Sequence, residues 1–104
     1  MKNAMSHPNA ESMKRNASKA ASMLKQLASG PRLMILCSLV SGEKTVGELQ
    51  EYVALSQSAL SQHLAKLRAA GLVVGEKRGQ AVCYSLSSME AQAILSTLYL
   101  IYCR

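Results

Sequence analysis

Apolar residues recur with a helical period in the first third of the chain. From Met13 they stand at i, i+4, i+7, i+11 and i+14, which places them on one face of an α-helix. The pair Gly30-Pro31 ends this helix and begins the next, because proline fits the first position of a helix. Residues 31 to about 41 are almost all apolar, so we expect this second helix to be buried.

Two shorter helices follow, and each begins at a hydroxyl residue that can cap it. Thr45 and Glu48 have the spacing of a capping box, which opens a third helix that runs to about Val53. Ser56 can cap a fourth helix, and Gly71 ends that helix as a left-handed stop residue. The buried stripe of the fourth helix consists of Leu60, Leu64 and Leu67.

The last third of the chain predicts a hairpin and one more helix. Two β-rich runs, residues 72–74 and 81–86, flank a charged turn that contains glycine. Ser87 and Glu90 have the spacing of a second capping box, which opens a final helix that is apolar on all sides. The expected fold is therefore mainly α with a β-hairpin wing, in the arrangement of a winged helix-turn-helix.

The length of the chain limits this fold to a single unit. Its 104 residues allow one domain with one modest core, which we assign to residues 11–104 after a flexible tail at residues 1–10. The sequence contains no apolar run near the ~18 residues of a membrane span, and its start lacks the apolar part of a secretory signal. We therefore predict a cytoplasmic protein that does not bind a membrane.

The charge balance changes this picture, because it indicates a partner. Twelve Lys and Arg residues stand against six Asp and Glu, which gives a net charge of +6. A basic balance of this size in a short chain favours a polyanion such as nucleic acid. The alternative is that the positive charge serves only solubility.

The fourth helix carries small polar side chains opposite its leucine stripe. An α-helix fits the major groove of DNA, where glutamine can pair bidentately with adenine and hydroxyl groups can contact phosphates. The basic tip of the hairpin can reach backbone phosphates or an adjacent minor groove. The candidate DNA-binding residues are Ser56, Gln57, Ser58, Ser61, Gln62, His63, Lys66, Lys77, Arg78 and Gln80. The alternative interpretation is an ordinary solvated face.

Residues 55–73, LSQSALSQHLAKLRAAGLV, resemble the recognition-helix segment of the ArsR/SmtB family of bacterial repressors. The resemblance extends from about residue 18 to residue 104. It implies a homodimer joined through the first and last helices, which agrees with the apolar final helix. It also implies repression through binding to double-stranded operator DNA, relieved when an inducer binds.

Metal sensing at the usual sites of that family is disfavoured. One common site is a Cys-x-Cys in the third helix, where residues 48–52, ELQEY, contain no thiol. Another site uses Asp, His and Glu in the last helix, which here offers only Glu90 and no histidine. We therefore predict no metal ligand and no cofactor.

The remaining candidate chemistry lies in the three cysteines, an odd number that does not suggest a disulfide framework. Cys37 in the second helix and Cys103 beside the C-terminus resemble the thiol pair of a persulfide-sensing branch of the family. That resemblance implies that persulfides or polysulfides link the two sulfurs and so weaken DNA binding. The alternative for Cys37 is a small core residue. Cys83, in the hairpin, is expected to be a bystander.

Three other functions remain open at this point. The first is a repressor of the same family that senses general oxidants, or a metal ion at a non-standard site. The second is a thiol enzyme, which is disfavoured because the sequence offers no Cys-x-x-Cys, no nucleophile–base pair and no acidic dyad. The third is a winged helix used only for protein contacts, which salt-dependent DNA affinity would exclude.

Overall fold

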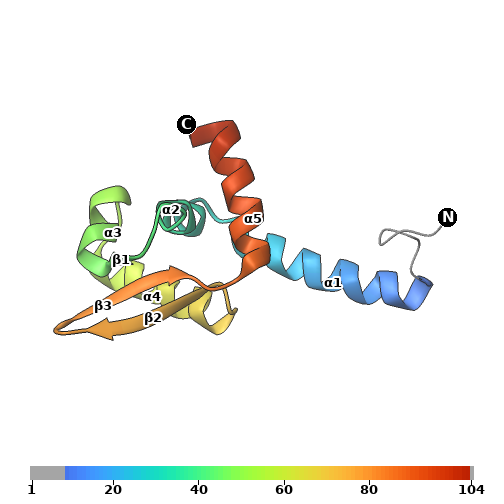
Figure 1. Cartoon of the computed structure of the whole chain (residues 1–104), viewed down its shortest axis with the longest axis horizontal. Coiled ribbons are helices and arrows are strands. Elements are labelled where there is room, and N and C mark those ends of the chain that lie inside the picture. The colour runs from blue at the N-terminus through green and yellow to red at the C-terminus, as the bar shows by residue number, and fades with distance from the viewer. Residues whose placement is uncertain (1–8, 104) are drawn as a thin grey trace.

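The computed structural model describes residues 9–103, with the exception of the Cys103 side chain, and Figure 1 traces its elements. Their bounds are α1 Ala10–Leu27, α2 Gly30–Ser38, β1 Lys44–Thr45, α3 Val46–Tyr52, α4 Gln57–Ala69, β2 Val73–Arg78, β3 Ala81–Leu86, α5 Met89–Leu98 and the π-helical η1 Tyr99–Cys103. This order confirms the predicted mainly helical fold with a β-hairpin wing. The predicted tail falls largely on residues 1–8, which lie outside the described residues.

Helix α1 begins earlier than the domain start that we predicted. Asn9 caps it, since its Oδ1 atom accepts a hydrogen bond of 2.7 Å from the backbone N–H of Ser12. Within α1 the only buried residue is Leu27, at the end where the helix meets the rest of the molecule. The helix extends away from the other elements, as Figure 1 shows, and the molecule measures 53 × 28 × 25 Å.

Helix α2 ends at Ser38, about three residues before the predicted end. The turn that stops it is closed by a hydrogen bond from the N–H of Gly42 to the carbonyl of Leu39. Gly42 has a φ of 139°, a conformation that glycine adopts without steric cost. The chain then enters β1, a two-residue strand where the sequence predicted only a loop.

The wing is therefore a three-stranded antiparallel sheet with the strand order β1-β3-β2. Strand β2 continues through the charged stretch that we expected to be the turn, so that Arg78 pairs with Ala81. The turn itself is reduced to Gly79 and Gln80, and Gly79 has a φ of 64°. Lys77 and Arg78 consequently lie on a regular strand beside this turn.

Helix α5 is capped one residue later than predicted. The hydroxyl oxygen of Ser88, not that of Ser87, accepts from the backbone N–H of Ala91 at 3.1 Å. Ser87 instead donates its hydroxyl to the carbonyl of Gly71 at 3.0 Å, which ties the start of α5 to the end of α4. The predicted Ser87–Glu90 capping box is therefore wrong: Ser88 caps α5, and the third residue after it is Ala91, which has no side chain that could reach back.

The core is aliphatic and joins the last residue of α1 to most of the other elements. Each large side chain in it contributes about 1.5–3 kcal/mol through burial. The buried residues are Leu27, Ile35, Leu36, Leu39, Leu49, Val53, Leu60, Leu64, Leu67, Leu72, Val73, Ala91 and Leu95. All three leucines of the predicted α4 stripe are among them.

Candidate DNA-binding surface and thiol site

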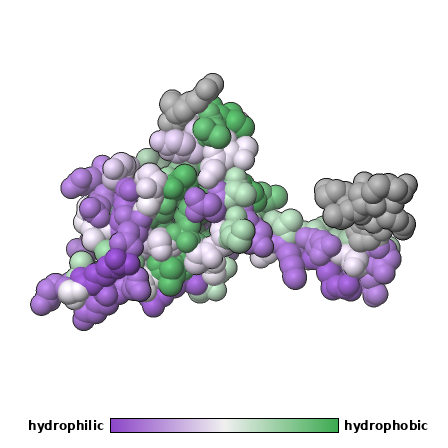
Figure 2. Space-filling model, viewed as in Figure 1, coloured by the Kyte–Doolittle hydropathy of each residue, from purple (hydrophilic) through white to green (hydrophobic). Residues whose placement is uncertain are grey.

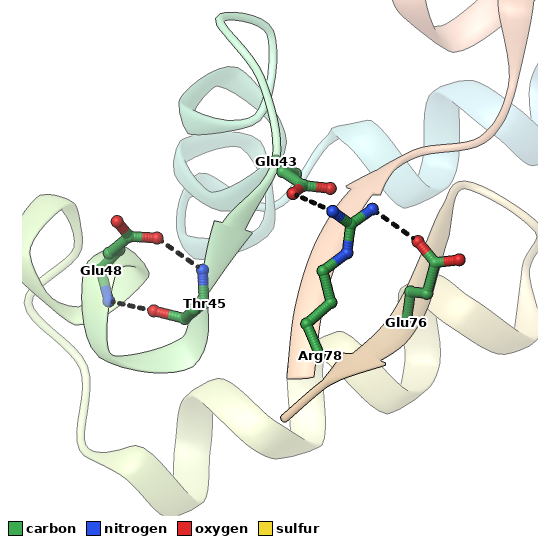
Figure 3. A network of polar contacts seen from close by, with 5 residues as sticks. All are labelled: Glu43, Thr45, Glu48, Glu76 and Arg78. Atoms are coloured by element: carbon green, nitrogen blue, oxygen red, sulfur yellow. Dashed lines mark hydrogen bonds and ion pairs between the residues drawn. The ribbon is translucent and has the colours of Figure 1, made fainter. Parts of the chain in front are cut away.

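The α3–α4 pair is held by two caps that the sequence predicted. The Thr45 hydroxyl accepts from the N–H of Glu48 at 3.1 Å, and the Glu48 carboxylate accepts from the N–H of Thr45 at 2.9 Å (Figure 3). The Ser56 hydroxyl accepts from the N–H of Ala59 at 3.1 Å and so begins α4. These caps fix the first turns of both helices and hence the direction in which α4 projects its side chains.

Burial of its leucine stripe turns the opposite face of α4 to solvent. Most of the candidate DNA-binding residues of this helix are exposed: Ser56, Gln57, Ser58, Ser61, Gln62 and Lys66. Hydroxyl, amide and ammonium groups therefore share one accessible surface. This is the arrangement that contact with base edges and phosphates requires.

His63 differs from the other candidates on α4. Its side chain is half-buried, and its Nδ1 atom is buried with no hydrogen-bond partner. A helical position next to the leucine stripe explains this burial, because Leu60 and Leu64 on the same helix pack inward. His63 is therefore set closer to the core than the residues with which we grouped it.

The hairpin candidates Lys77, Arg78 and Gln80 are all exposed, but Arg78 already has partners. Its guanidinium lies 2.7 Å from the Glu76 carboxylate and 3.2 Å from the Glu43 carboxylate (Figure 3). The hydrogen bond to Glu76 and the negative charges of both carboxylates raise the pKa of Arg78 above its ordinary value. Sequence reasoning missed these two acids, although the i, i+2 spacing of Glu76 and Arg78 on one strand face is a signal for the first.

The surface separates into polar and apolar regions. In Figure 2 the wing end is hydrophilic, as is much of the projecting α1, whereas a hydrophobic patch lies at the end of α5 and η1. Exposed apolar residues of this end are Tyr99, Leu100, Ile101 and Tyr102. The wing end thus presents polar groups to solvent, and the apolar end suits a protein partner.

Cys37 is half-buried and lines an open groove of about 720 Å³. Residues of α2, the α3–α4 connection and η1 form its walls, and they include Leu33, Met34, Tyr52, Leu55 and Tyr99. None of its twelve lining residues, all of which the structure describes, carries a charged side chain. This groove could not be predicted from sequence, because its walls come from three distant segments.

The other two thiols lie in different settings. Cys83 is half-buried on β3, where it pairs with Thr45 of β1 and Glu76 of β2. Cys103 is the last residue of η1, and its side chain lies outside the described residues. The predicted link between the Cys37 and Cys103 sulfurs therefore involves a side chain outside the described residues.

The described side chains of residues 9–102 include no group of three or more His, Cys, Asp or Glu that could hold a metal ion. No helix within the described residues 9–103 has the length and apolar character needed to cross a membrane.

Comparison with known proteins identifies the family. A model of the arsR family of bacterial regulatory proteins matches residues 29–74, from the cap of α2 into β2. The transcriptional activator HlyU of Vibrio cholerae is 49% identical over 92% of this chain and 89% of its own length. This chain belongs to the arsR family.

Other similarities agree with this assignment to the arsR family. A biofilm growth-associated repressor of Xylella fastidiosa is 37% identical over 97% of this chain and 89% of its own length. The structure of reduced HlyU from Vibrio cholerae superimposes with a TM-score of 0.86 at 49% identity, covering 90% of this chain and 99% of that one. The arsR-family chain is thus a DNA-binding transcriptional regulator and not an enzyme.

Proposed function

We propose that this protein is a homodimeric repressor with a thiol switch. It binds double-stranded operator DNA while Cys37 and Cys103 are reduced. Persulfides or polysulfides link the two sulfurs, and the linked protein releases the DNA. The α4 face contacts base edges, and Lys77, Arg78 and Gln80 of the wing contact the phosphate backbone.

The observation that carries the thiol part of this proposal is the position of Cys37. It lies on the wall of a groove that also contains Tyr99, the first residue of the segment that ends at Cys103. A bond between Cys37 and Cys103 would therefore connect α2 to η1 across this groove. Two relatives also support a regulator of this type, since one is an activator whose structure is of the reduced protein and the other is a repressor.

The chemistry needs no oxidant besides the persulfide. The Cys37 thiolate attacks the outer sulfur of RSSH, which forms Cys37–SSH and releases RSH. The Cys103 thiolate then attacks the Cys37 sulfur, which forms the disulfide and releases H₂S. Both thiols are oxidised, and the persulfide bond is reduced to RSH and H₂S. Longer polysulfides leave additional sulfur atoms in the bridge.

A covalent bond between α2 and η1 can affect the DNA-binding surface through the direct contacts of α2. Helix α2 packs against α3, α4 and α5. The loop that leaves α2 carries Glu43, which forms an ion pair with Arg78 of the wing. A shift of α2 would therefore act on both the recognition helix and the wing, as a two-state switch requires.

Dimerisation is supported by apolar surface on the elements that the family resemblance implicates. Leu24 in α1 is 54% exposed and Tyr102 in η1 is 78% exposed. A shallow hollow of about 300 Å³ on α5 is lined by Ala93, Ile94, Thr97 and Leu98. Exposed apolar surface on several elements of a small chain favours a second copy of the chain as the partner.

The test uses a duplex selected from a random library for binding to the reduced protein. Wild type, Cys37→Ser and the matched control Cys83→Ser are treated with glutathione persulfide, and DNA binding is followed by fluorescence anisotropy. We expect release from wild type and from Cys83→Ser but not from Cys37→Ser. Release from Cys37→Ser would show that the proposed switch is wrong.

Mass spectrometry of the same samples identifies the inducer chemistry. A bridge with inserted sulfur adds multiples of the mass of sulfur, less two hydrogens. A simple disulfide removes only the two hydrogens, and a bound metal ion adds its own mass. A metal adduct with no change at Cys37 would favour the alternative of a metal sensor.

A further inference from the structure

The groove beside Cys37 has an uncharged wall, and the Lys44 side chain lies at its rim. The Lys44 ammonium donates to the Ser41 hydroxyl at 3.2 Å and lies 5.3 Å from the centre of the Tyr52 ring. Ser41 and Tyr52 both line the groove, whereas Lys44 does not. The Lys44 ammonium thus contacts two wall residues without itself forming part of the wall.

The interior of the groove favours an apolar guest. Leu33, Met34 and Leu55 offer aliphatic or thioether surface, and a methyl or allyl group gains by leaving water for such a wall. A carboxylate placed on the same wall would lose hydration without a charged partner. A volume of about 720 Å³ is ample for a compound with a few carbon and sulfur atoms.

We propose that this groove is a binding site for neutral organic polysulfides, and that it delivers their sulfur to Cys37. This inference rests on the proposed function, because it names the inducer class that the thiol pair takes. It predicts a preference for a dialkyl trisulfide over the trisulfide of glutathione, which carries carboxylates and ammonium groups. The two reagents share one reactive S–S–S unit and differ only in their organic arms.

The reaction balances without a further reactant. The Cys37 thiolate attacks the central sulfur of RSSSR, which forms Cys37–S–S–S–R and releases one RSH. The Cys103 thiolate attacks the same sulfur and releases the second RSH, which leaves a trisulfide between the two cysteines. Two thiols are oxidised, and the reagent is reduced to two molecules of RSH.

The experiment measures how fast Cys37 in the full-length protein reacts with dimethyl trisulfide and with glutathione trisulfide, by mass spectrometry of its peptide. The ratio of the two rates in the folded protein is divided by the same ratio for the chain unfolded in urea. This division corrects for the difference in intrinsic reactivity between the two trisulfides. We expect a folded-state preference of about ten-fold for dimethyl trisulfide, the gain from burying two methyl groups.

A matched pair of variants tests the groove. Met34 is a 51% exposed wall residue, and Met34→Lys should reduce the preference several-fold by placing a cation in the cavity. Val74→Lys adds the same charge at a 47% exposed position of β2, which contributes nothing to the groove, and should leave the preference unchanged. Circular dichroism verifies that both variants are folded.

Two results would overturn this inference. One is a folded-state preference equal to that of the unfolded chain. The other is a preference for glutathione trisulfide that Lys44→Gln abolishes, since the rim lysine would then select anions. DNA release is measured in parallel, so that the proposed function is tested separately. If the protein releases DNA but reacts with both trisulfides without a folded-state preference, only the proposed role of the groove is wrong. If it shows the preference but keeps the DNA bound, only the proposed thiol switch is wrong.

Discussion

The Nη1 atom of Arg78 lies 3.2 Å from Oε2 of Glu43, and this ion pair joins the wing to the loop that follows α2 (Figure 3). Glu76 holds the other terminal nitrogen of the same guanidinium at 2.7 Å. A wing arginine that is predicted to contact DNA phosphate is therefore already bound to two carboxylates. Phosphate contact by Arg78 requires that these carboxylates be displaced or share the guanidinium.

Glu43→Gln is expected to strengthen DNA binding. The substitution removes a negative charge beside the proposed phosphate contact and replaces the ion pair between Glu43 and Arg78 with a weaker neutral contact. Because the ion pair is exposed, we expect a gain of only about two- to five-fold in affinity. The gain should shrink as salt is added, since exposed charges are screened. Fluorescence anisotropy titrations at several salt concentrations measure both effects.

Glu11→Gln is the control for this change, because it alters the net charge equally in the first turn of α1, the end of that helix that projects away from the wing (Figure 1). Its effect on DNA affinity should be smaller than that of Glu43→Gln. Equal gains from the two variants would mean that net charge, and not the Glu43–Arg78 contact, sets the affinity.

Two neighbouring residues of α4 should affect DNA binding in different ways. Gln62→Ala removes a side chain that can read a base edge, so it should cost about 1–3 kcal/mol of discrimination at one position of the operator. Lys66→Ala removes a phosphate contact, so it should weaken binding to all duplexes and lower the salt slope by about 1.

Binding to the selected duplex and to a scrambled one, at several salt concentrations, separates these effects. Gln92→Ala, an exposed change on α5, is the control and should alter neither quantity. If Gln62→Ala and Lys66→Ala weaken binding to both duplexes alike, the proposed base contact of Gln62 is wrong.

The helices were predictable from sequence because their signals are local. The leucine stripe and the Ser56 and Gly71 stops of α4 lie within one short segment, and the Thr45–Glu48 capping box spans four residues. The choice between Ser87 and Ser88 at the start of α5 was not local. It depends on the carbonyl of Gly71, which lies 16 residues away and accepts the Ser87 hydroxyl.

The features that the sequence did not predict come from long-range pairing. Strand β1 consists of two residues that become a strand only because β3 lies alongside them. The groove beside Cys37 is likewise formed when Leu55 and Tyr99 are brought next to α2. Neither contact leaves a periodic signal in its own segment, so pattern analysis could identify Cys37 as a candidate but not its surroundings.

The capping box of α3 should make a measurable contribution to stability. Thr45→Ala removes the acceptor for the N–H of Glu48 and should cost about 1 kcal/mol. For a domain of this size that corresponds to a fall of about 4–8 °C in the melting temperature. Thr45→Ser keeps the hydroxyl and should recover most of the loss in thermal denaturation.

The two halves of the box should not be independent. Glu48→Ala removes the reciprocal bond, and the double variant should lose less stability than the sum of the single changes. Strict additivity would mean that the two hydrogen bonds stabilise α3 separately and do not act as one cap.

A charge on the apolar stripe of α1 should dissociate the proposed dimer. Leu24 is 54% exposed in the single chain, so Leu24→Glu costs little if the stripe faces water and a great deal if a second copy covers it. Ser22→Glu adds the same charge at an exposed polar position of the same helix and should leave the assembly intact. Sedimentation equilibrium gives the mass of each variant.

The DNA affinities of Leu24→Glu and Ser22→Glu connect dimerisation to function. A dimer holds two α4 helices at a fixed spacing, so the second half-site is bound at high effective concentration. A monomeric Leu24→Glu should therefore lose about 10²-fold or more in operator affinity while its affinity for a single half-site is unchanged. If Leu24→Glu stays dimeric and binds the operator as wild type does, α1 lies outside the dimer interface and the apolar surface of α5 and η1 alone must account for assembly.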